Sequence, residues 1–316
     1  MPPASEPSSF AAHLPLSRAT IDRDHLSRTF GVEALLAEPE ARAIVLRSGE
    51  ALLAGPAEIA LLPGTEVPPH ALALYLGRAV DDSPGLPAGA PVLAVVLDED
   101  AVEDPGDQRH WGNLRELGAR LSDRDAGLFT EALGLANWHR SYGFSPRTGN
   151  ASIPDAGGWT RRDVETGTEI FPRTDAAVIM GITDHDDRIL LGSNAMWKSN
   201  RFSVLAGFVE PGESLEAAVI REVHEESGLR VVDPVYLGSQ PWPFPASLMV
   251  GFRARLAPGE SPEPQADGEE ILELRWFTRD ELTASLGEIG LPGRTSIARA
   301  ILEDWYGGPI DDGVEW

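Results

Sequence analysis

The chain has 316 residues, enough for about two domains, and 42% of them are hydrophobic, which is ample for a sizeable core. A formal net charge of −24 disfavours a protein that grips nucleic acid over its whole surface, since that needs clustered Lys and Arg, but the end of an RNA could still bind in a pocket. The chain contains no cysteine, which excludes disulfides and thiolate metal sites.

Residues 1–24 are rich in Pro and Ser and are predicted to form a flexible arm. They contain no continuous apolar run, so we expect no signal peptide. Nowhere does the chain have the roughly eighteen consecutive apolar residues that a membrane span needs. A cytoplasmic protein without membrane contacts fits this pattern best.

Residues 25–140 are expected to form a mostly β N-terminal domain. The segments ARAIVL (41–46) and ALLAG (51–55) flank a turn-like tetrapeptide, and APVLAVVLDED (90–100) is strongly β-forming. After Ser122, a good N-cap residue, apolar residues recur at helical spacing. This helix should close the domain.

The two remaining segments differ in pattern. Residues 141–172 show little periodicity and many Gly, Thr and Pro residues, which predicts a small irregular connector. Residues 173–316 begin with a hairpin and a strand, continue with a helix from about Leu215 to Ser227 and further strands, and finish with a last helix. The chain as a whole is therefore expected to be of the α+β class.

The helix that starts near Leu215 carries the most informative residues. Ser214 can cap it, and its apolar positions lie along one stripe. Glu222, Glu225 and Glu226 have i, i+3, i+4 spacing, so three carboxylates project from one face. A hard divalent cation such as Mg²⁺ or Mn²⁺ would neutralise them. Taken alone, however, the three glutamates are more simply explained as a solvated acidic face.

The complete pattern around this helix is more specific. It reads G-x5-E-x7-R-E-U-x-E-E-x-G-U, where U is apolar, and every fixed position is occupied by Gly207, Glu213, Arg221, Glu222, Val223, Glu225, Glu226, Gly228 and Leu229. This segment resembles the Nudix box. The resemblance implies a C-terminal α/β/α sandwich around a mixed sheet, with the box as a loop–helix–loop.

The resemblance also implies a metal centre. Glu222 and Glu226 match the principal metal ligands, Glu225 matches an accessory ligand, and the backbone carbonyl of Ala206 is expected as a further ligand. A carboxylate from a distant loop usually joins them, and Glu270 is the candidate for this ligand or for the base. Its neighbour Glu269 is the rival, and either could be a solvated loop acid.

Other box residues are expected to have structural roles. Arg221 should orient the carboxylates by ion pairing, and Glu213 should brace the loop against the helix. Gly207 and Gly228 allow the tight backbone turns at the two ends of the box. Catalysis itself is expected from Glu225, Glu226 and Glu270, through metal ions that bind the two phosphates and acidify the attacking water.

A second motif, from Ser239 to Ser247, indicates the substrate. Its three prolines limit backbone freedom, which suits either selective binding of a flat polar ligand or a rigid packing loop. The pattern S-Q-P-W-P-F-P-x-S directly after a Nudix box resembles that of the NADH pyrophosphatase (NAD-capped RNA hydrolase) family. This resemblance implies substrate contacts at Gln240, Pro241, Trp242, Pro243, Phe244, Pro245, Ala246, Ser247, Phe171, Phe208 and Ala298, although Phe171 could equally be a core aromatic residue.

One departure from the family concerns the connector. Many relatives carry a zinc ribbon of two C-x2-C pairs, whereas this chain, like an actinobacterial type, has Ser145, Thr148, Asp163 and Thr166 at the four ligand positions. Neutral hydroxyls bind Zn²⁺ poorly, so we expect no structural zinc in this ribbon-like connector.

The sequence therefore predicts an NAD⁺ diphosphatase. It should hydrolyse NADH or NAD⁺ to NMNH or NMN and AMP, remove NAD caps from RNA 5′ ends as a second activity, and form a homodimer. A hydrolase of ADP-ribose or dinucleoside polyphosphates is the alternative enzyme, which the second motif disfavours. A non-catalytic nucleotide sensor is the alternative from another class, which the complete set of box carboxylates disfavours.

Overall fold

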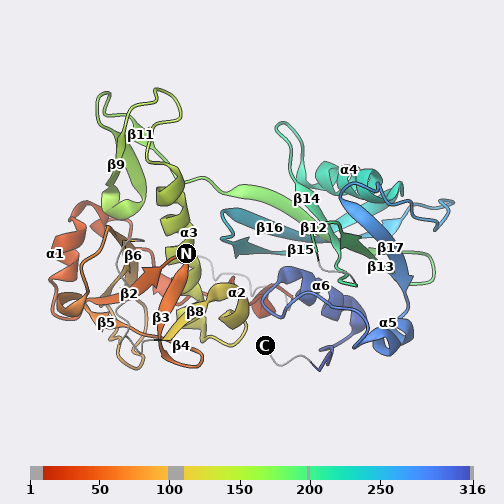
Figure 1. Ribbon diagram of the computed structural model, residues 1–316, viewed down its shortest axis with the longest axis horizontal. Coiled ribbons are helices and arrows are strands. Elements are labelled where there is room, and N and C mark those ends of the chain that lie inside the picture. The colour runs from red at the N-terminus through yellow and green to blue at the C-terminus, as the bar shows by residue number, and fades with distance from the viewer. Residues whose placement is uncertain (1–9, 99–109, 198–199, 314–316) are drawn as a thin grey trace, which may run out of the picture. The chain divides into compact units, whose positions relative to one another are not determined.

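The fold is taken from a computed structural model, which describes residues 10–98, 110–197 and 200–313 (Figure 1). Contacts divide the chain into two compact units. The C-terminal unit comprises Met1–Ser17, Asp175–Pro241 and Ser247–Trp316, and the N-terminal unit comprises Arg18–Thr174 and Trp242–Ala246. Five residues from the middle of the second motif thus belong to the N-terminal unit.

The N-terminal unit contains a mixed sheet of eight strands among the described residues, in the order β1-β6-β7-β2-β3-β4, with β5 paired to β2 and β8 to β3. Among these described strands, β2 and β7 are the pair that runs parallel. The strands are β1 (Ile21–Asp22), β2 (Arg42–Arg47), β3 (Glu50–Gly55), β4 (Glu58–Ile59), β5 (Leu62–Pro63), β6 (Leu72–Ala79), β7 (Pro91–Val96) and β8 (His110–Asn113). The strands predicted at 41–46 and 51–55 are confirmed as β2 and β3.

Short helices and one long helix complete this unit: η2 (Ser27–Thr29), α1 (Val32–Leu36), η3 (Gly64–Glu66), α2 (Leu114–Leu117) and α3 (Asp123–Ser141). The predicted N-cap is confirmed, because the Ser122 hydroxyl accepts a hydrogen bond of 3.2 Å from the backbone N–H of Asp125. The segment 99–109, which includes the end of the predicted strand 90–100, lies outside the described residues.

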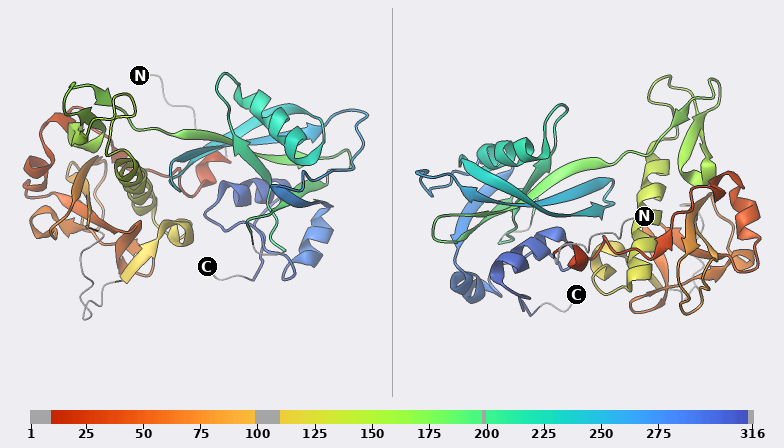
Figure 2. Two further views of the ribbon diagram at one scale, coloured as in Figure 1. Left: turned by 45° about the horizontal axis from the view of Figure 1, so that its top comes forward. Right: turned by 180° about the vertical axis from the view of Figure 1, so that it is seen from behind.

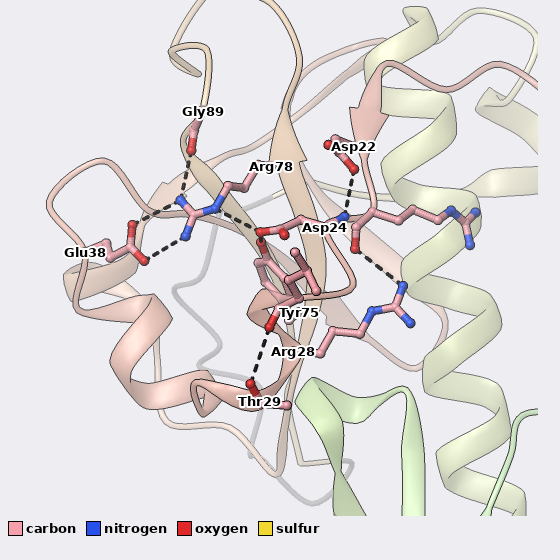
Figure 3. Close-up of polar contacts among 10 residues, drawn as sticks. Asp22, Asp24, Arg28, Thr29, Glu38, Tyr75, Arg78 and Gly89 are labelled. Carbon is pink, nitrogen blue, oxygen red and sulfur yellow. Dashed lines mark hydrogen bonds and ion pairs between the residues drawn. The ribbon is translucent and has the colours of Figure 1, made fainter. Parts of the chain in front are cut away.

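A polar network ties β6 to the segments around it (Figure 3). The Arg78 guanidinium donates to both carboxylate oxygens of Glu38, at 3.1 and 3.2 Å, to Asp24 at 3.1 Å and to the carbonyl of Gly89 at 3.0 Å. The Tyr75 hydroxyl donates to the same Asp24 carboxylate at 2.8 Å. These charge-assisted bonds fix the polar edge of a core to which the fully buried Tyr75 ring belongs.

The connector forms a small three-stranded sheet of β9 (Ser152–Asp155), β10 (Thr160–Asp163) and β11 (Glu169–Ile170), with η4 (Ala156–Gly158) between the first two. The strand order is β11-β10-β9, and both pairs are antiparallel. This ribbon-like arrangement forms although no position in it is a cysteine.

Hydrogen bonds join the four positions at which relatives carry zinc ligands. Asp163 is 1% exposed, and its carboxylate accepts from the Thr148 hydroxyl at 2.5 Å, the Asn150 side chain at 3.2 Å and the Thr166 backbone N–H at 3.0 Å. The Ser145 hydroxyl accepts from the Thr148 backbone N–H at 3.4 Å. The bond from Thr148, followed by that from the Thr166 N–H, holds the pKa of Asp163 well below its usual range. The Asp163 carboxylate therefore connects the segment around Thr148 with the segment around Thr166.

The C-terminal unit has a mixed sheet of six strands in the part of the chain that is described, in the order β15-β16-β12-β13-β17, with β14 paired to β12. Its strands are β12 (Asp175–Thr183), β13 (Ile189–Asn194), β14 (Leu205–Phe208), β15 (Val231–Trp242), β16 (Ser247–Leu256) and β17 (Ile271–Phe277). Its helices are η1 (Ala11–His13), α4 (Leu215–Ser227), α5 (Arg279–Ser285) and α6 (Ile297–Tyr306). The expected helix 215–227 is confirmed as α4.

Helices cover both faces of this sheet. In β12, Val178, Met180 and Ile182 pack in one core with α4, whereas the intervening Ile179 packs in another core with α6. Figures 1 and 2 show α4 and α6 on opposite sides of the strands. The predicted α/β/α sandwich is confirmed.

Part of the predicted N-terminal arm is packed. Residues 1–9 of the arm lie outside the described residues, but Leu14 and Leu16 are 0% and 2% exposed. Leu14 belongs to the α6 core, where burial of its apolar side chain offsets the entropy of ordering this segment. The arm is therefore not loose over its whole length. None of the described helices is both long and apolar enough to cross a membrane.

Candidate active site

Helix α4 presents the box carboxylates because both of its ends are fixed and one face is buried. The Ser214 hydroxyl accepts from the Ala217 N–H at 3.1 Å, and Gly228 ends the helix with φ +70°. Glu226 lies on the side of α4 that packs against the core and is 4% exposed. The side chain of Glu222 is 13% exposed and that of Glu225 is 57% exposed.

The backbone at Gly207, in β14, makes room for Glu222. A Cβ atom there would lie 1.9 Å from the carboxyl carbon of Glu222 and about as close to both of its oxygens. Only a residue without a side chain allows this approach. Ala206, whose carbonyl is the expected extra ligand, is the partly buried neighbour of Gly207 in the same strand.

Arg221 connects the acidic side chains around the box. Its guanidinium binds both oxygens of Glu213, at 2.8 and 2.9 Å, and pairs with Glu222 at 2.9 Å and Glu225 at 2.8 Å. It also donates to the carbonyl of Phe208 at 3.0 Å. The bonds from Arg221 lower the pKa of Glu213 to about 2. Arg221 and Glu213 thus clamp the loop before α4 against the helix.

Glu226 is the most buried of the three α4 carboxylates. Burial, followed by the negative charges of Glu270, Glu222 and nearby acids, raises its pKa to about 8. Its Oε2 atom is buried and has no hydrogen-bond partner among the described residues. Burial, with the charges of Glu225 and Glu270 adding to it, also raises the pKa of Glu222, although Arg221 opposes this. The charge of Glu270 is among the largest causes of the raised pKa of both glutamates, and that of Glu269 is not.

Two residues that sequence reasoning missed position Glu270. The Asp267 carboxylate accepts the backbone N–H groups of Glu269, Glu270 and Ile271 at 2.9, 3.0 and 2.9 Å. The Asn194 side chain, at the end of β13, donates to the Glu270 carboxylate at 3.3 Å. The Asp267-Gly268 pair is a turn signal that could have been noticed, but no local pattern marks Asn194.

The donor set fits a divalent cation. As they stand, no three His, Asp or Glu side chains among the described residues converge closely enough to hold an ion. However, the negative charges of Glu222, Glu225, Asp267 and Glu270 all act on Glu226, and one buried oxygen of Glu226 has no hydrogen-bond partner among the described residues. Oxygen donors with this concentration of negative charge suit a hard cation such as Mg²⁺ or Mn²⁺.

Gln240, which the second motif predicts as a substrate contact, is buried and bound to other parts of the chain. It lies within β15, is 0% exposed, and uses both ends of its amide inside the protein. Its Oε1 accepts from the Leu16 N–H at 3.1 Å, and its Nε2 donates to the Thr295 carbonyl at 2.9 Å. The amide thereby joins three distant segments, because a buried polar group is costly unless it is satisfied.

The middle of the motif, Trp242–Ala246, forms the end of β15 and the turn to β16 and belongs to the N-terminal unit. The rings of Trp242 and Phe244 meet edge to face at 4.9 Å, and the Arg115 guanidinium lies 5.4 and 4.2 Å from their centres. Asn137 on α3 donates to the carbonyls of Pro243 and Pro245 at 2.9 and 3.3 Å. These contacts hold the two aromatic rings in place.

The remaining predicted substrate residues differ in exposure. Phe171 and Phe208 are 66% and 60% exposed, so Phe171 is not a core aromatic residue. Ala298 is 3% exposed, and its backbone N–H donates to the Ser296 hydroxyl at 3.1 Å, which caps α6. Pro241 and Pro245 are exposed, whereas Ala246 and Ser247 are partly buried.

Comparison with known proteins matches both halves of the chain to family models. Residues 172–298 match the NUDIX domain, and residues 40–138 match the NADH pyrophosphatase-like rudimentary NUDIX domain. The latter match covers most of the sheet of the N-terminal unit.

Similar proteins include two mycobacterial enzymes and a human one. The "NAD-capped RNA hydrolase NudC" of Mycobacterium bovis is 42% identical over 282 residues, which cover 86% of this chain and 85% of the relative. That of Mycobacterium tuberculosis is 41% identical with the same coverage. The human "NAD-capped RNA hydrolase NUDT12" is 36% identical over 200 residues, 59% of this chain and 43% of the relative.

Proposed function

The chain belongs to the NAD-capped RNA hydrolase family of Nudix hydrolases, and we propose that its α4 carboxylates cleave the diphosphate bond of NAD(H). It is an NAD diphosphatase, which converts NADH or NAD⁺ to NMNH or NMN and AMP and removes NAD caps from RNA. The reaction breaks the bond between one phosphorus and the bridging oxygen while water forms a new bond to phosphorus.

The burial of Glu226 beside other carboxylates carries the proposal. A buried carboxylate with an unsatisfied oxygen, facing Glu270 and Glu222, is costly unless a cation neutralises it. We assign Glu222, Glu225, Glu226, Glu270 and the Ala206 carbonyl as the residues that would hold Mg²⁺ or Mn²⁺. When bound, a divalent ion supplies charge neutralisation and Lewis acidity towards the diphosphate.

The chain's own residues prepare this site. Arg221 holds Glu222 and Glu225 in position through ion pairs, and Glu213 holds Arg221 in turn. Asn194 and Asp267 fix the segment that carries Glu270, which we propose as the group that takes the proton from the attacking water. Such positioning reduces the reorganisation that the reaction requires.

For a base of NAD(H) we propose the exposed ring of Phe208, which follows Gly207 of the box in the C-terminal unit. Exposed aromatic rings offer stacking surfaces to adenine and nicotinamide. We further propose that the protein acts in the cytoplasm as a homodimer, as implied by its family resemblance.

Product analysis tests the proposed function. The purified chain is incubated with NADH, NAD⁺, ADP-ribose and NAD-capped RNA, each with Mg²⁺, with Mn²⁺ and with a chelator. We expect NMNH or NMN with AMP from the dinucleotides, 5′-monophosphate RNA from the capped RNA, and no product with the chelator. Faster cleavage of ADP-ribose would contradict the substrate assignment, and tight NADH binding without products would indicate a sensor.

A further inference from the structure

An exposed tryptophan follows the residue that contacts Glu270. Asn194 donates to the Glu270 carboxylate, and the Ala195 N–H donates to the Glu270 carbonyl at 2.8 Å. The chain then turns, with the Trp197 N–H bound to the Asn194 carbonyl at 3.0 Å and the Met196 N–H to the Asn194 side chain at 2.9 Å. Trp197 therefore lies one tight turn away from the candidate base.

The surface at this turn is apolar although the protein is strongly acidic. Trp197 is 38% exposed and Met196 is 87% exposed. Neither residue belongs to the cores on the two faces of the sheet. Large apolar side chains on a surface next to a catalytic segment indicate a contact with a ligand rather than a packing role.

Arg201 adds a positive charge to this surface. Its guanidinium lies 5.6 Å from the centre of the Trp197 ring, and within the described part of the chain no carboxylate pairs with it. Its backbone is anchored, because the flanking Asn200 and Phe202 exchange hydrogen bonds of 2.8 and 2.9 Å with Gly290. An unpaired cation beside an exposed aromatic ring suits a phosphate joined to a stacked base.

We propose that Trp197 and Arg201 form a subsite for the nucleotide that follows the cap in an NAD-capped RNA. Trp197 stacks on the base of that nucleotide, and Arg201 binds the phosphate that links it to the NAD adenosine. Free NADH carries neither of these groups. The proposal rests on the proposed function and specifies how the same active site prefers a capped RNA to the free dinucleotide.

Physical reasons favour this occupant over the nicotinamide. The proposed function already provides the exposed ring of Phe208 for a base of NAD(H). A net charge of −24 repels an RNA chain, so its first phosphate needs a local cation, which Arg201 provides. Stacking tolerates every base, which suits an enzyme that acts on many transcripts.

Parallel kinetics with Trp197→Ala test the subsite. We expect kcat/KM for NAD-capped RNA to fall roughly 5- to 150-fold, the range that one stacked base contributes, while kcat/KM for NADH changes less than about twofold. Trp197→Phe should restore most of the activity on RNA. In a series from NAD⁺ to NAD extended by one nucleotide and to longer RNA, the effect of the substitution should appear at the first added nucleotide.

Arg201→Gln gives an independent readout. We expect a smaller slope of log kcat/KM against log salt for capped RNA, by about 0.7 for one phosphate contact, and no change in slope for NADH. The matched control is Tyr236→Ala, which removes an aromatic ring that is 56% exposed. Tyr236 lies in β15, at one edge of the sheet order, whereas β17, which pairs with β13, lies at the other edge. This control should leave both substrates unaffected.

Two outcomes would overturn the subsite. Equal losses for NADH and capped RNA in Trp197→Ala would place the ring against NAD itself, and unchanged RNA kinetics would show that the ring contacts no nucleotide. Failure of the proposed function is distinguishable from both, since the unsubstituted protein would then cleave neither NADH nor capped RNA. Thermal unfolding of each variant establishes that the fold is retained.

Discussion

A Cβ atom at Gly207 would lie 1.9 Å from the carboxyl carbon of Glu222. The strand before the box and the helix within it therefore approach one another closely enough to forbid any side chain at this point. The glycine of the motif is required because a metal-ligand candidate occupies the space that a side chain would fill.

Gly207→Ala should consequently displace Glu222 and lower kcat/KM for NADH by roughly 100-fold, the effect of moving a catalytic group by about 1 Å. Steady-state NADH hydrolysis measures this loss. Gly293→Ala is the matched control, because nothing lies within 4 Å of a Cβ built there, and it should leave kcat/KM unchanged. Full activity of Gly207→Ala would show that Glu222 tolerates displacement.

Glu226→Gln should lower kcat by roughly 100-fold or more without loss of the folded state, because the amide keeps the shape of the side chain but cannot neutralise a cation. Single-turnover hydrolysis with Mg²⁺ and circular dichroism are the two measurements. Glu216→Gln, on the exposed surface of the same helix, controls for the change in charge. Near-normal turnover of Glu226→Gln would remove Glu226 from the proposed metal centre.

Gln240→Ala distinguishes a structural residue from a substrate contact. Loss of two buried hydrogen bonds, to Leu16 and Thr295, should reduce the free energy of unfolding by about 2–5 kcal/mol. Denaturant unfolding measures this, and the exposed Gln265→Ala is the control. Where the variant is folded, KM for NADH should remain that of the unsubstituted protein. A raised KM with unchanged stability would restore the ligand contact suggested by the motif.

Glu131, on α3, should make stability depend on pH. Burial, at 8% exposure, raises its pKa from 4.5 to about 7, although Arg23 and Arg28 oppose this. The unfolded chain thus releases the proton at lower pH than the folded chain. The contribution of Glu131 to stability is therefore fully present below pH 4.5 and is lost as the pH rises through about 7.

Glu131→Gln removes this dependence. Between pH 4.5 and 7.5 the stability of the unsubstituted protein should fall relative to the variant by roughly 3 kcal/mol. Denaturant unfolding at several pH values measures the difference, and Glu116→Gln, at an exposed position, should show no such divergence. Parallel stability curves for Glu131→Gln and the unsubstituted protein would contradict the shifted pKa.

The parts of the site that were predictable depend on local spacing. The interval between Glu222 and Glu226 and the capping residues Ser214 and Gly228 are sufficient to predict α4 and the face its carboxylates share. The contact of Asn194 with Glu270 depends instead on the register of β13 against β17, in which Asn194 pairs with Ile271. Such a register joins residues far apart in the sequence, and a single sequence does not specify it.

The second motif shows what local sequence does not predict. Its prolines correctly indicate a stiff segment, but they do not reveal that Gln240 is covered by Leu16, more than two hundred residues earlier in the chain. The same long-range packing explains why the expectation of a loose arm fails at Leu14 and Leu16. Local composition describes the stiffness of a segment, whereas burial depends on partners that only the folded chain brings together.

The hydrogen-bonded ribbon around Asp163 has a consequence for how the enzyme tolerates its surroundings. Thiolate zinc sites lose their metal to oxidants, and their folding depends on the supply of zinc. Here a carboxylate and hydroxyl groups perform the same cross-linking, so neither peroxide nor zinc starvation has a target in this segment. A chelator that abolishes hydrolysis should therefore leave the fold intact, and the addition of Mg²⁺ alone should restore activity.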